Sequence, residues 1–138
     1  MSYLIDTCAL SELVRAAPAP QVVAWFEAAP EDALFVSVLT LGEIRKGAEH
    51  LPVGNRRARI VDWLEHRLPA WFGERVLPVD APVADEWGRL AAHAGRTLPA
   101  VDTLIAATAL RHRLAIVTRN LDDFRTTGAD LINPWERR

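Results

Sequence analysis

Short apolar runs alternate along this chain with longer segments whose apolar residues recur at helical spacing. Strands separated by helices need crossover connections, and a right-handed crossover places the two strands parallel in one sheet. The alternation therefore predicts an α/β/α sandwich with a mainly parallel central sheet of four to five strands. The expected strands are residues 3–5, 33–38, 75–79 and 115–118, with a short fifth at 129–132.

The segments between these runs predict helices, and proline or glycine marks several of their ends. Pro30 is expected to end the second helix, and Gly47 to interrupt the third. Because the 138 residues contain no repeat or linker, a single domain over residues 1–138 is expected. The expected helices are residues 7–15, the segment between Pro20 and Pro30, and residues 39–49, 56–72, 81–95 and 98–113.

The composition of the chain indicates its cellular compartment. Cys8 is the only cysteine, so a disulfide scaffold is excluded. The N-terminal residues lack the basic region and the long apolar run of a signal peptide. No stretch approaches the ~20 consecutive apolar residues of a membrane span. We therefore expect a cytoplasmic protein without a membrane partner.

Polar residues that could form a site fall at the carboxyl ends of the expected strands, where open parallel sheets bind ligands. Asp6 directly follows the first strand, and Glu43 lies about a turn and a half into the helix after the second. Asn120 and Asp123 follow the fourth strand. Asp102 sits in the opening turns of the helix that leads into the fourth strand. This helix must run back across the strand ends for Asp102 to join the other candidates.

Carboxylates that gather at one edge of a sheet repel each other unless a cation compensates them. Oxygen ligands select hard ions, so Mg²⁺ is expected, with Mn²⁺ as the alternative, and neither Cys8 nor the four histidines have the spacing of zinc ligands. A divalent ion bound in this way activates water and neutralises charge on a phosphodiester, so phosphodiester hydrolysis fits better than acyl transfer. Dinucleotide-binding and P-loop folds are disfavoured, because no glycine-rich turn follows Asp6 and no P-loop is present.

The net charge bears on the substrate. Arginine and lysine total 16 against 18 acidic residues, and the formal charge of −2 by itself argues mildly against a nucleic-acid partner. One bound Mg²⁺ would offset that charge, and arginine, whose planar fork suits phosphate, dominates the basic residues. The basic residues near segments that flank the strand ends are Arg45, Lys46, Arg56, Arg57, Arg59, Arg111, Arg113 and Arg119.

Four segments resemble, in order and in spacing, the motifs of PIN-domain ribonucleases of the VapC toxin type. They are residues 4–10 (LIDTCAL), 37–47 (SVLTLGEIRKG), 102–109 (DTLIAATA) and 117–124 (VTRNLDDF). The closing residues 132–135 (INPW) are similar to the FitB-like branch of that family. Each motif is weak alone, but together they cover the chain from end to end.

The resemblance implies a metal-dependent endoribonuclease that hydrolyses RNA, the toxin of a type II toxin–antitoxin pair. Such toxins are usually homodimers neutralised by a small VapB-like antitoxin, in heterotetramers or larger assemblies. Asp6 and Asp102 match the family's principal Mg²⁺ ligands, and Glu43 completes the acidic triad. Asn120 stands where the family often has Asp, so either Asn120 or Asp123 is expected at the fourth catalytic position.

Each candidate also has a purely structural explanation. Asp6 could cap the helix that follows it. Glu43 could pair with Lys46 on the surface of its helix. Asp102 could oppose the dipole of its own helix. The resemblance outweighs these explanations and adds Thr7 and Thr118 as hydroxyls that commonly support the site.

Three further expectations concern packing and function. Cys8 is interpreted as a small core residue. Because a small core cannot bury every aromatic ring, one of the pairs at residues 25–26 and 71–72 is expected to face a dimer partner or an antitoxin. The alternative function is a PIN domain kept mainly as an interaction module, whose complex with an antitoxin binds operator DNA. The uncharged Asn120 keeps this alternative open.

Overall fold

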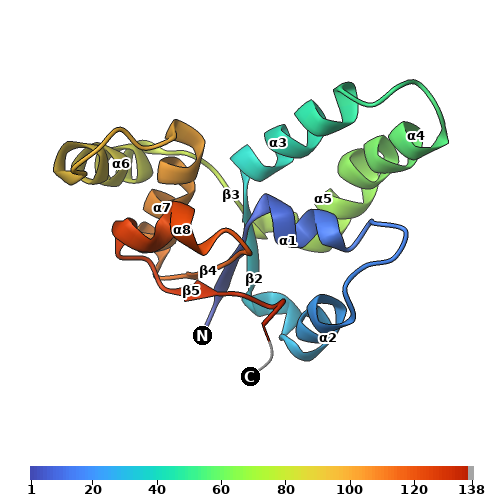
Figure 1. Ribbon diagram of the computed structural model, residues 1–138, viewed down its shortest axis with the longest axis horizontal. Helices are drawn as coiled ribbons and strands as arrows, with labels where there is room; N and C mark the ends of the chain where they lie inside the picture. The colour runs from blue at the N-terminus through green and yellow to red at the C-terminus, as the bar shows by residue number, and fades with distance from the viewer. Residues whose placement is uncertain (137–138) are drawn as a thin grey trace.

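The computed structural model describes residues 1–136, which form a five-stranded parallel sheet between two layers of helices (Figure 1). The strand order is β3-β2-β1-β4-β5, and every neighbouring pair is parallel. The predicted α/β/α sandwich is therefore confirmed, with all five strands present. The strands are β1 (Tyr3–Ile5), β2 (Leu34–Ser37), β3 (Val76–Leu77), β4 (Ala115–Val117) and β5 (Leu131–Ile132).

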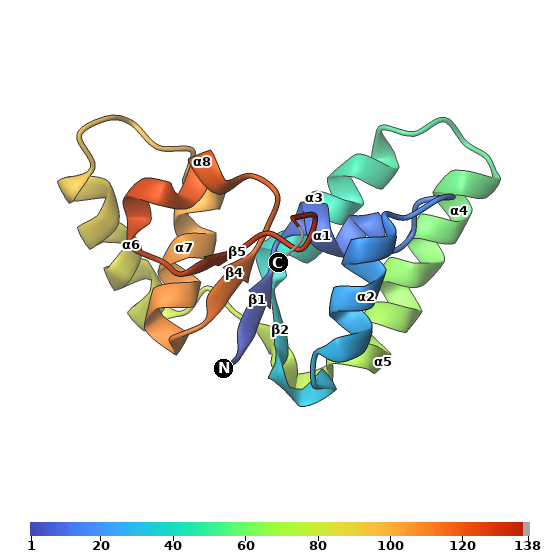
Figure 2. The same ribbon diagram turned by 60° about the horizontal axis from the view of Figure 1, so that its bottom comes forward.

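The helices divide between the two faces of the sheet. Figure 2 shows α6, α7 and α8 on one side of the sheet and α1 to α5 on the other. No helix within residues 1–136 combines the length and the apolar character needed to cross a membrane. The helices are α1 (Thr7–Glu12), α2 (Pro20–Ala28), α3 (Val38–Glu49), α4 (Asn55–Asp62), α5 (Leu68–Phe72), α6 (Ala81–His93), α7 (Ala100–His112) and α8 (Leu121–Phe124).

Side chains along each strand point alternately to the two faces of the sheet, and the core therefore consists of two clusters, one on each face. Ile5 and Val117 belong to the cluster beneath α1, α2 and α5, whereas Leu4 and Ile116 belong to the cluster beneath α7 and α8. All four side chains are fully buried. Because successive side chains of a strand point to opposite faces, a short continuous apolar run can fill both clusters. This explains why these strands read as uninterrupted apolar segments.

The first helix is shorter than the predicted segment 7–15. It ends at Glu12, and the backbone then turns with hydrogen bonds between residues three apart. The Glu12 carboxylate, which is 4% exposed, accepts hydrogen bonds from the Ala19 N–H (2.8 Å) and from Arg15 (3.1 Å). Burial alone would raise the pKa of Glu12, but these hydrogen bonds outweigh it and lower that pKa. The buried carboxylate thus fastens the turn that ends α1.

The predicted helix 56–72 contains a π-helical turn at Trp63–Arg67, between α4 and α5. The Leu68 N–H bonds to the Trp63 carbonyl, one residue further back than in an α-helix. Pro69, which follows, has no N–H, and its ring would crowd the carbonyl of Glu65 in a regular helix. The wider π turn removes that conflict without breaking the helix.

Two other boundaries differ from expectation for reasons of backbone chemistry. Gly47 does not interrupt α3, which continues to Glu49, since a single helical glycine costs only about 1 kcal/mol. The predicted strand 75–79 shrinks to β3, two residues long, because Pro78 cannot donate a hydrogen bond to the sheet.

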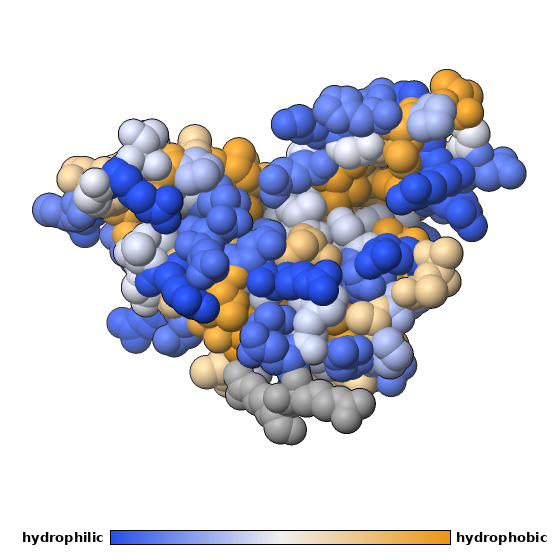
Figure 3. Space-filling model, viewed as in Figure 1, coloured by the Kyte–Doolittle hydropathy of each residue, from blue (hydrophilic) through white to orange (hydrophobic). Residues whose placement is uncertain are grey.

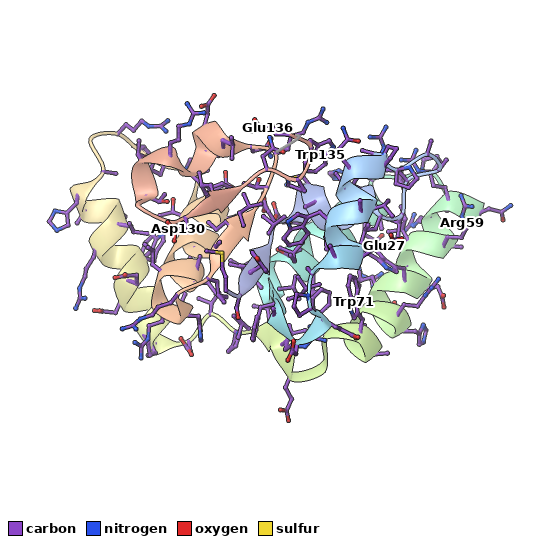
Figure 4. The ribbon with its side chains drawn as sticks, turned by 90° about the horizontal axis from the view of Figure 1, so that it is seen from below. Glu27, Arg59, Trp71, Asp130, Trp135 and Glu136 are labelled. Atoms are coloured by element: carbon purple, nitrogen blue, oxygen red, sulfur yellow. The ribbon has the colours of Figure 1, made fainter. Side chains whose placement is uncertain are left out.

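The aromatic residues at 25–26 and 71–72 pack on one another inside the protein. The rings of Trp25 and Phe26 are 5.3 Å apart, Phe26 and Trp71 6.2 Å, and Trp71 and Phe72 4.5 Å. Phe26 and Phe72 are buried, and the two tryptophans are half-buried against the same core cluster, with Trp71 between α2 and α5 (Figure 4). The two pairs thus form one continuous aromatic row in which both tryptophans keep some exposed surface, and the expected contact of one pair with a dimer partner or an antitoxin stays a prediction.

We predict that Phe72→Ala lowers the free energy of unfolding by about 3–5 kcal/mol, because it leaves a cavity in the aromatic row. Trp87→Ala is the matched control, since this ring on α6 is 37% exposed and its removal should cost much less. Urea unfolding followed by circular dichroism measures both values. Equal losses in the two variants would contradict this description of the core.

Candidate active site

Asp6 lies at the carboxyl edge of the sheet, where the central strand β1 ends. Its backbone N–H bonds to the Val117 carbonyl (3.0 Å), which extends the pairing with β4 by one residue. Its side chain is 5% exposed, and Oδ2 accepts a hydrogen bond from the Thr118 hydroxyl (2.8 Å). Asp6 occupies the N-cap position of α1 but makes no side-chain capping bond. The explanation of Asp6 as a helix cap was therefore wrong.

Cys8 belongs to this arrangement and is not simply a core residue. Its Sγ lies 3.6 Å from Asp6 Oδ2 and 3.5 Å from Thr118 Oγ1, and it accepts a hydrogen bond from the Arg119 N–H (3.4 Å). Burial and the charge of Asp6 raise the pKa of the thiol, so it stays protonated at neutral pH. Sequence reasoning missed this role, although Cys8 is only two residues after Asp6 in the sequence.

Thr118 connects the ends of β1 and β4. Its hydroxyl donates to Asp6 Oδ2 and accepts a hydrogen bond from the Asn120 N–H (3.0 Å). The hydroxyl position expected from the resemblance therefore contacts Asp6 directly. Burial raises the pKa of Asp6, the Thr118 hydrogen bond opposes that effect, and the charge of Glu43 adds to the increase.

Glu43 reaches the same edge from α3. The Thr7 hydroxyl donates to Glu43 Oε1 at 2.6 Å, which joins the first turn of α1 to the middle of α3. The Ser37 side chain caps the N-terminus of α3 by accepting from the Leu39 N–H (3.1 Å). Within residues 1–136, Glu43 forms no ion pair with Lys46. The explanation of Glu43 as a solvated helix residue is therefore not supported.

Asp102 lies in the first turn of α7, and the charges of the other acids affect its pKa. Burial, followed by the charges of Asp6, Asp123 and Glu43, raises the pKa of Asp102 to about 6. A favourable helix dipole alone would lower this pKa, so the dipole does not explain the residue. The first turn of α7 thus lies near the other acids, while the rest of the helix packs on one face of the sheet. Four carboxylates from four separate segments interact here.

The two candidates for the fourth position differ in their surroundings. Asp123, on α8, is exposed, and its charge contributes to the raised pKa of Asp102. Asn120 is also exposed, and its backbone N–H bonds to Thr118, but no hydrogen bond of its side chain occurs in the described part of the chain. Asp123 is therefore electrostatically coupled to the acids, and Asn120 is held only through its backbone.

The donor set fits a hard divalent cation in chemistry and in charge. All the donors are carboxylate oxygens. Burial raises the pKa of Asp102 most, and a cation would relieve the repulsion that adds to this increase. Among residues 1–136, no three His, Cys, Asp or Glu side chains form a group that is already set to hold a metal ion. The fit is thus one of donor type and charge and does not extend to preformed coordination geometry.

A groove leads away from Thr7 and Glu43. A cavity of about 410 Å³ lies beside these two residues, and a neighbouring cavity has a volume of about 710 Å³. Figure 3 shows apolar surface in the hollow between α1 and the arm formed by α3 and α4, with hydrophilic rims. Of the four acids, Glu43 lines this groove, which has a mixed arginine and apolar character. The residues that line both cavities are Val14, Arg15, Arg56, Ile60 and Trp63.

Comparisons with known proteins agree on one family. The family model for the PIN domain matches residues 3–129. The VapC ribonuclease Y4jK of Sinorhizobium fredii is 39% identical over 137 residues, which cover 96% of this chain and 97% of that protein.

Two solved structures extend the likeness to three dimensions. The crystal structure of FitAcB from Neisseria gonorrhoeae superposes with a TM-score of 0.89 at 33% identity, covering 98% of this chain and 99% of that one. VapBC-5 from Mycobacterium tuberculosis, a member of the VapBC family of toxin–antitoxin systems, has a TM-score of 0.65 at 28% identity and covers 95% of each chain.

We predict that Asp102→Asn stabilises the metal-free protein at pH 7 by about 1–2 kcal/mol, because it removes one of the repelling charges. A carboxyl whose folded pKa is raised from 3.8 to about 6 contributes stability below pH 4 that is lost as the pH rises through 6. The gain from the substitution should therefore grow between pH 4 and pH 7. Urea unfolding in EDTA at both pH values measures it.

The control for this prediction is Asp122→Asn, which removes an exposed carboxylate that pairs with Arg125. Its effect should stay within about 0.5 kcal/mol at either pH. A loss of stability in Asp102→Asn at pH 7, or a gain that does not change with pH, would contradict the proposed repulsion.

Proposed function

Because the chain belongs to the PIN-domain family, we propose that it is a Mg²⁺-dependent endoribonuclease that hydrolyses phosphodiester bonds of RNA. The observation that carries this proposal is the coupling of Asp102 to the charges of Asp6, Asp123 and Glu43 at one edge of the sheet. A cation bound among these four acids would offset their charge and make the site able to accept an anionic substrate. The name of the 39% identical relative, a VapC ribonuclease, supports the same activity.

In this proposal Asp6, Asp102 and Glu43 hold the Mg²⁺, and Mn²⁺ could replace it. When bound, the ion would lower the pKa of a water molecule and neutralise charge that develops on the phosphate. The protein's own part is to orient the ligands. The Thr118 hydroxyl fixes Asp6 through Oδ2, and the Thr7 hydroxyl fixes Glu43 through Oε1.

The surroundings of Asp102 and Glu43 determine how each side chain can act. With a pKa of about 6, Asp102 is largely ionised at neutral pH and becomes protonated under mildly acidic conditions. The bond from Thr7 to Oε1 of Glu43 leaves Oε2 of that side chain to accept a hydrogen bond from a water molecule. We assign the fourth position to Asp123, because its charge reaches Asp102 and the side chain of Asn120 has no comparable coupling.

The biological role that we propose is the toxin of a type II toxin–antitoxin pair in the cytoplasm. The toxin would be a homodimer, held inactive by a VapB-like antitoxin in a heterotetramer or a larger complex. Support comes from the structural likeness to FitAcB and to VapBC-5, the second of which is described as a member of a toxin–antitoxin family. The other function left open by the sequence is an interaction module without catalysis.

We predict that the purified protein cleaves single-stranded RNA when Mg²⁺ or Mn²⁺ is added and not in EDTA. Asp6→Asn and Asp102→Asn should each lower the rate by about 100-fold or more, because each removes a charged ligand. Thr118→Val should lower it by about 10- to 100-fold, since it leaves the ligand but removes the hydroxyl that orients it. Initial rates on a fluorescently labelled RNA measure these effects.

Matched controls separate the acids from their neighbours. Asp122→Asn, next to Asp123 but pointing to the exposed Arg125, should cleave like the unmodified protein. Asp123→Asn should lose more activity than Asn120→Ala if Asp123 supplies the fourth position. Cleavage that persists in both Asp6→Asn and Asp102→Asn would refute the metal site. Absence of any cleavage by the folded protein would favour the interaction module.

A further inference from the structure

Arg119 is one of the arginines among residues 1–136 that form no ion pair, and an aromatic ring holds its guanidinium instead. Six arginines pair with carboxylates of the described residues, whereas Arg119 forms no ion pair there. Its guanidinium lies over the ring of Trp135, with Cζ 5.2 Å from the ring centroid. Arg119 is nonetheless exposed, so its N–H donors reach solvent. The six paired arginines are Arg15, Arg45, Arg57, Arg75, Arg89 and Arg125.

The backbone of Arg119 is attached to the carboxylate site. Its N–H donates to Cys8 Sγ (3.4 Å), and the same sulfur lies 3.6 Å from Asp6 Oδ2. Thr118, on one side of Arg119, donates to Asp6, and Asn120, on the other side, donates from its N–H to Thr118. The position of Arg119 is therefore fixed relative to Asp6 by these four hydrogen-bonded contacts.

Trp135 provides a rigid support for the guanidinium. Its N–H donates to Asn133 Oδ1 (2.9 Å), its carbonyl accepts a hydrogen bond from Gln21 (3.3 Å), and its half-buried ring packs against the core cluster beneath α2. Figure 4 shows Trp135 beside one end of α2, where the segment after β5 crosses the molecule. A cation–π contact of this kind holds the guanidinium plane while its N–H edges remain available.

The nearby carboxylates Glu12 and Asp6 accept no hydrogen bond from the guanidinium of Arg119 among the described residues. The charge of Arg119 contributes to the lowered pKa of Glu12, but the Glu12 oxygens already accept hydrogen bonds from Arg15 and from the Ala19 N–H. Asp6 is held by Thr118 and Cys8 instead. An unpaired guanidinium therefore stands at the rim of a strongly acidic site, where an anionic ligand needs a positive contact.

We propose that Arg119, supported by Trp135, binds a backbone phosphate of the RNA strand adjacent to the one that is cleaved. The proposal rests on the ribonuclease function proposed above and adds a substrate-binding residue to it. A planar guanidinium can donate two parallel hydrogen bonds to phosphate, which fixes the strand in orientation as well as in position. Trp135 acts as a positioning residue, because it holds the guanidinium and need not contact the RNA.

The test is equilibrium binding of a fluorescein-labelled single-stranded RNA of mixed sequence, measured by anisotropy over a range of salt concentrations. The protein carries Asp102→Asn throughout, so that binding is measured without cleavage. Arg119→Ala should weaken binding by about tenfold and reduce the slope of log K against log salt by about 0.7, the contribution of one single-strand phosphate contact. Arg119→Lys should restore the slope and only part of the affinity.

Two controls separate the proposal from general effects of charge and folding. Arg125→Ala removes an arginine that pairs with Asp122 on α8, and it should change neither the affinity nor the slope. Trp135→Leu should weaken binding by several-fold, whereas Trp135→Phe, which keeps an aromatic face, should retain most of it. Thermal melting of each variant checks that the fold is intact. Arg119→Ala is the decisive variant, because Arg119 is exposed and its truncation should leave the fold unchanged.

Several outcomes would overturn the proposal. If Arg119→Ala binds RNA with the same affinity and the same salt slope as Arg125→Ala, the proposal is refuted. The ribonuclease function would still stand in that case if the variants of the acidic residues abolish cleavage. Unchanged RNA binding combined with weaker binding of a protein partner would assign Arg119 to a protein interface instead. Unmodified protein that neither binds nor cleaves RNA would overturn both proposals together.

Discussion

Mutual repulsion among four carboxylates is the interaction on which the candidate site depends. Asp6, Glu43, Asp102 and Asp123 meet at one edge of the sheet, and their charges, together with burial, raise the pKa of Asp102 to about 6. Neutral hydroxyl and thiol groups contact Asp6 and Glu43, and none of the four acids forms an ion pair within residues 1–136. Repulsion left unrelieved by the protein can be offset by a divalent cation, which connects the electrostatics to the proposed chemistry.

The sheet topology produces this gathering. With β1 between β2 and β4, all parallel, the carboxyl ends of three strands meet at one edge, and the helices that follow or precede them deliver acids there. The hydrogen bonds of Thr7 and Thr118 then tie these separate segments together through the acids themselves. Site and fold are thus coupled, because the same side chains that would bind a cation also join α1 to α3 and to β4.

The sequence predicted the sheet from local pattern, because apolar runs mark the strands. Asp6 was proposed because it directly follows a strand, whereas the proposal of Glu43 and Asp102, which lie inside helices, relied on the family resemblance. The prediction from sequence failed for features that depend on contacts between distant residues. Glu12 ends α1 by bonding to a residue seven positions later, and the π turn before Pro69 depends on how a helix absorbs a missing N–H. The place of Cys8 beside Asp6, and the aromatic row around Trp71, arise only when distant segments meet.

Calorimetric titration of Mg²⁺ at pH 6, repeated in two buffers that differ in ionisation enthalpy, tests the central claim most directly. Because Asp102, with a pKa of about 6, is half protonated at that pH, binding of Mg²⁺ should release about half a proton. Asp102→Asn should bind Mg²⁺ more weakly and release fewer protons, the remainder coming from Asp6, whose pKa burial also raises. Equal affinity and equal proton release in the two proteins would contradict the account of these carboxylates as a metal site.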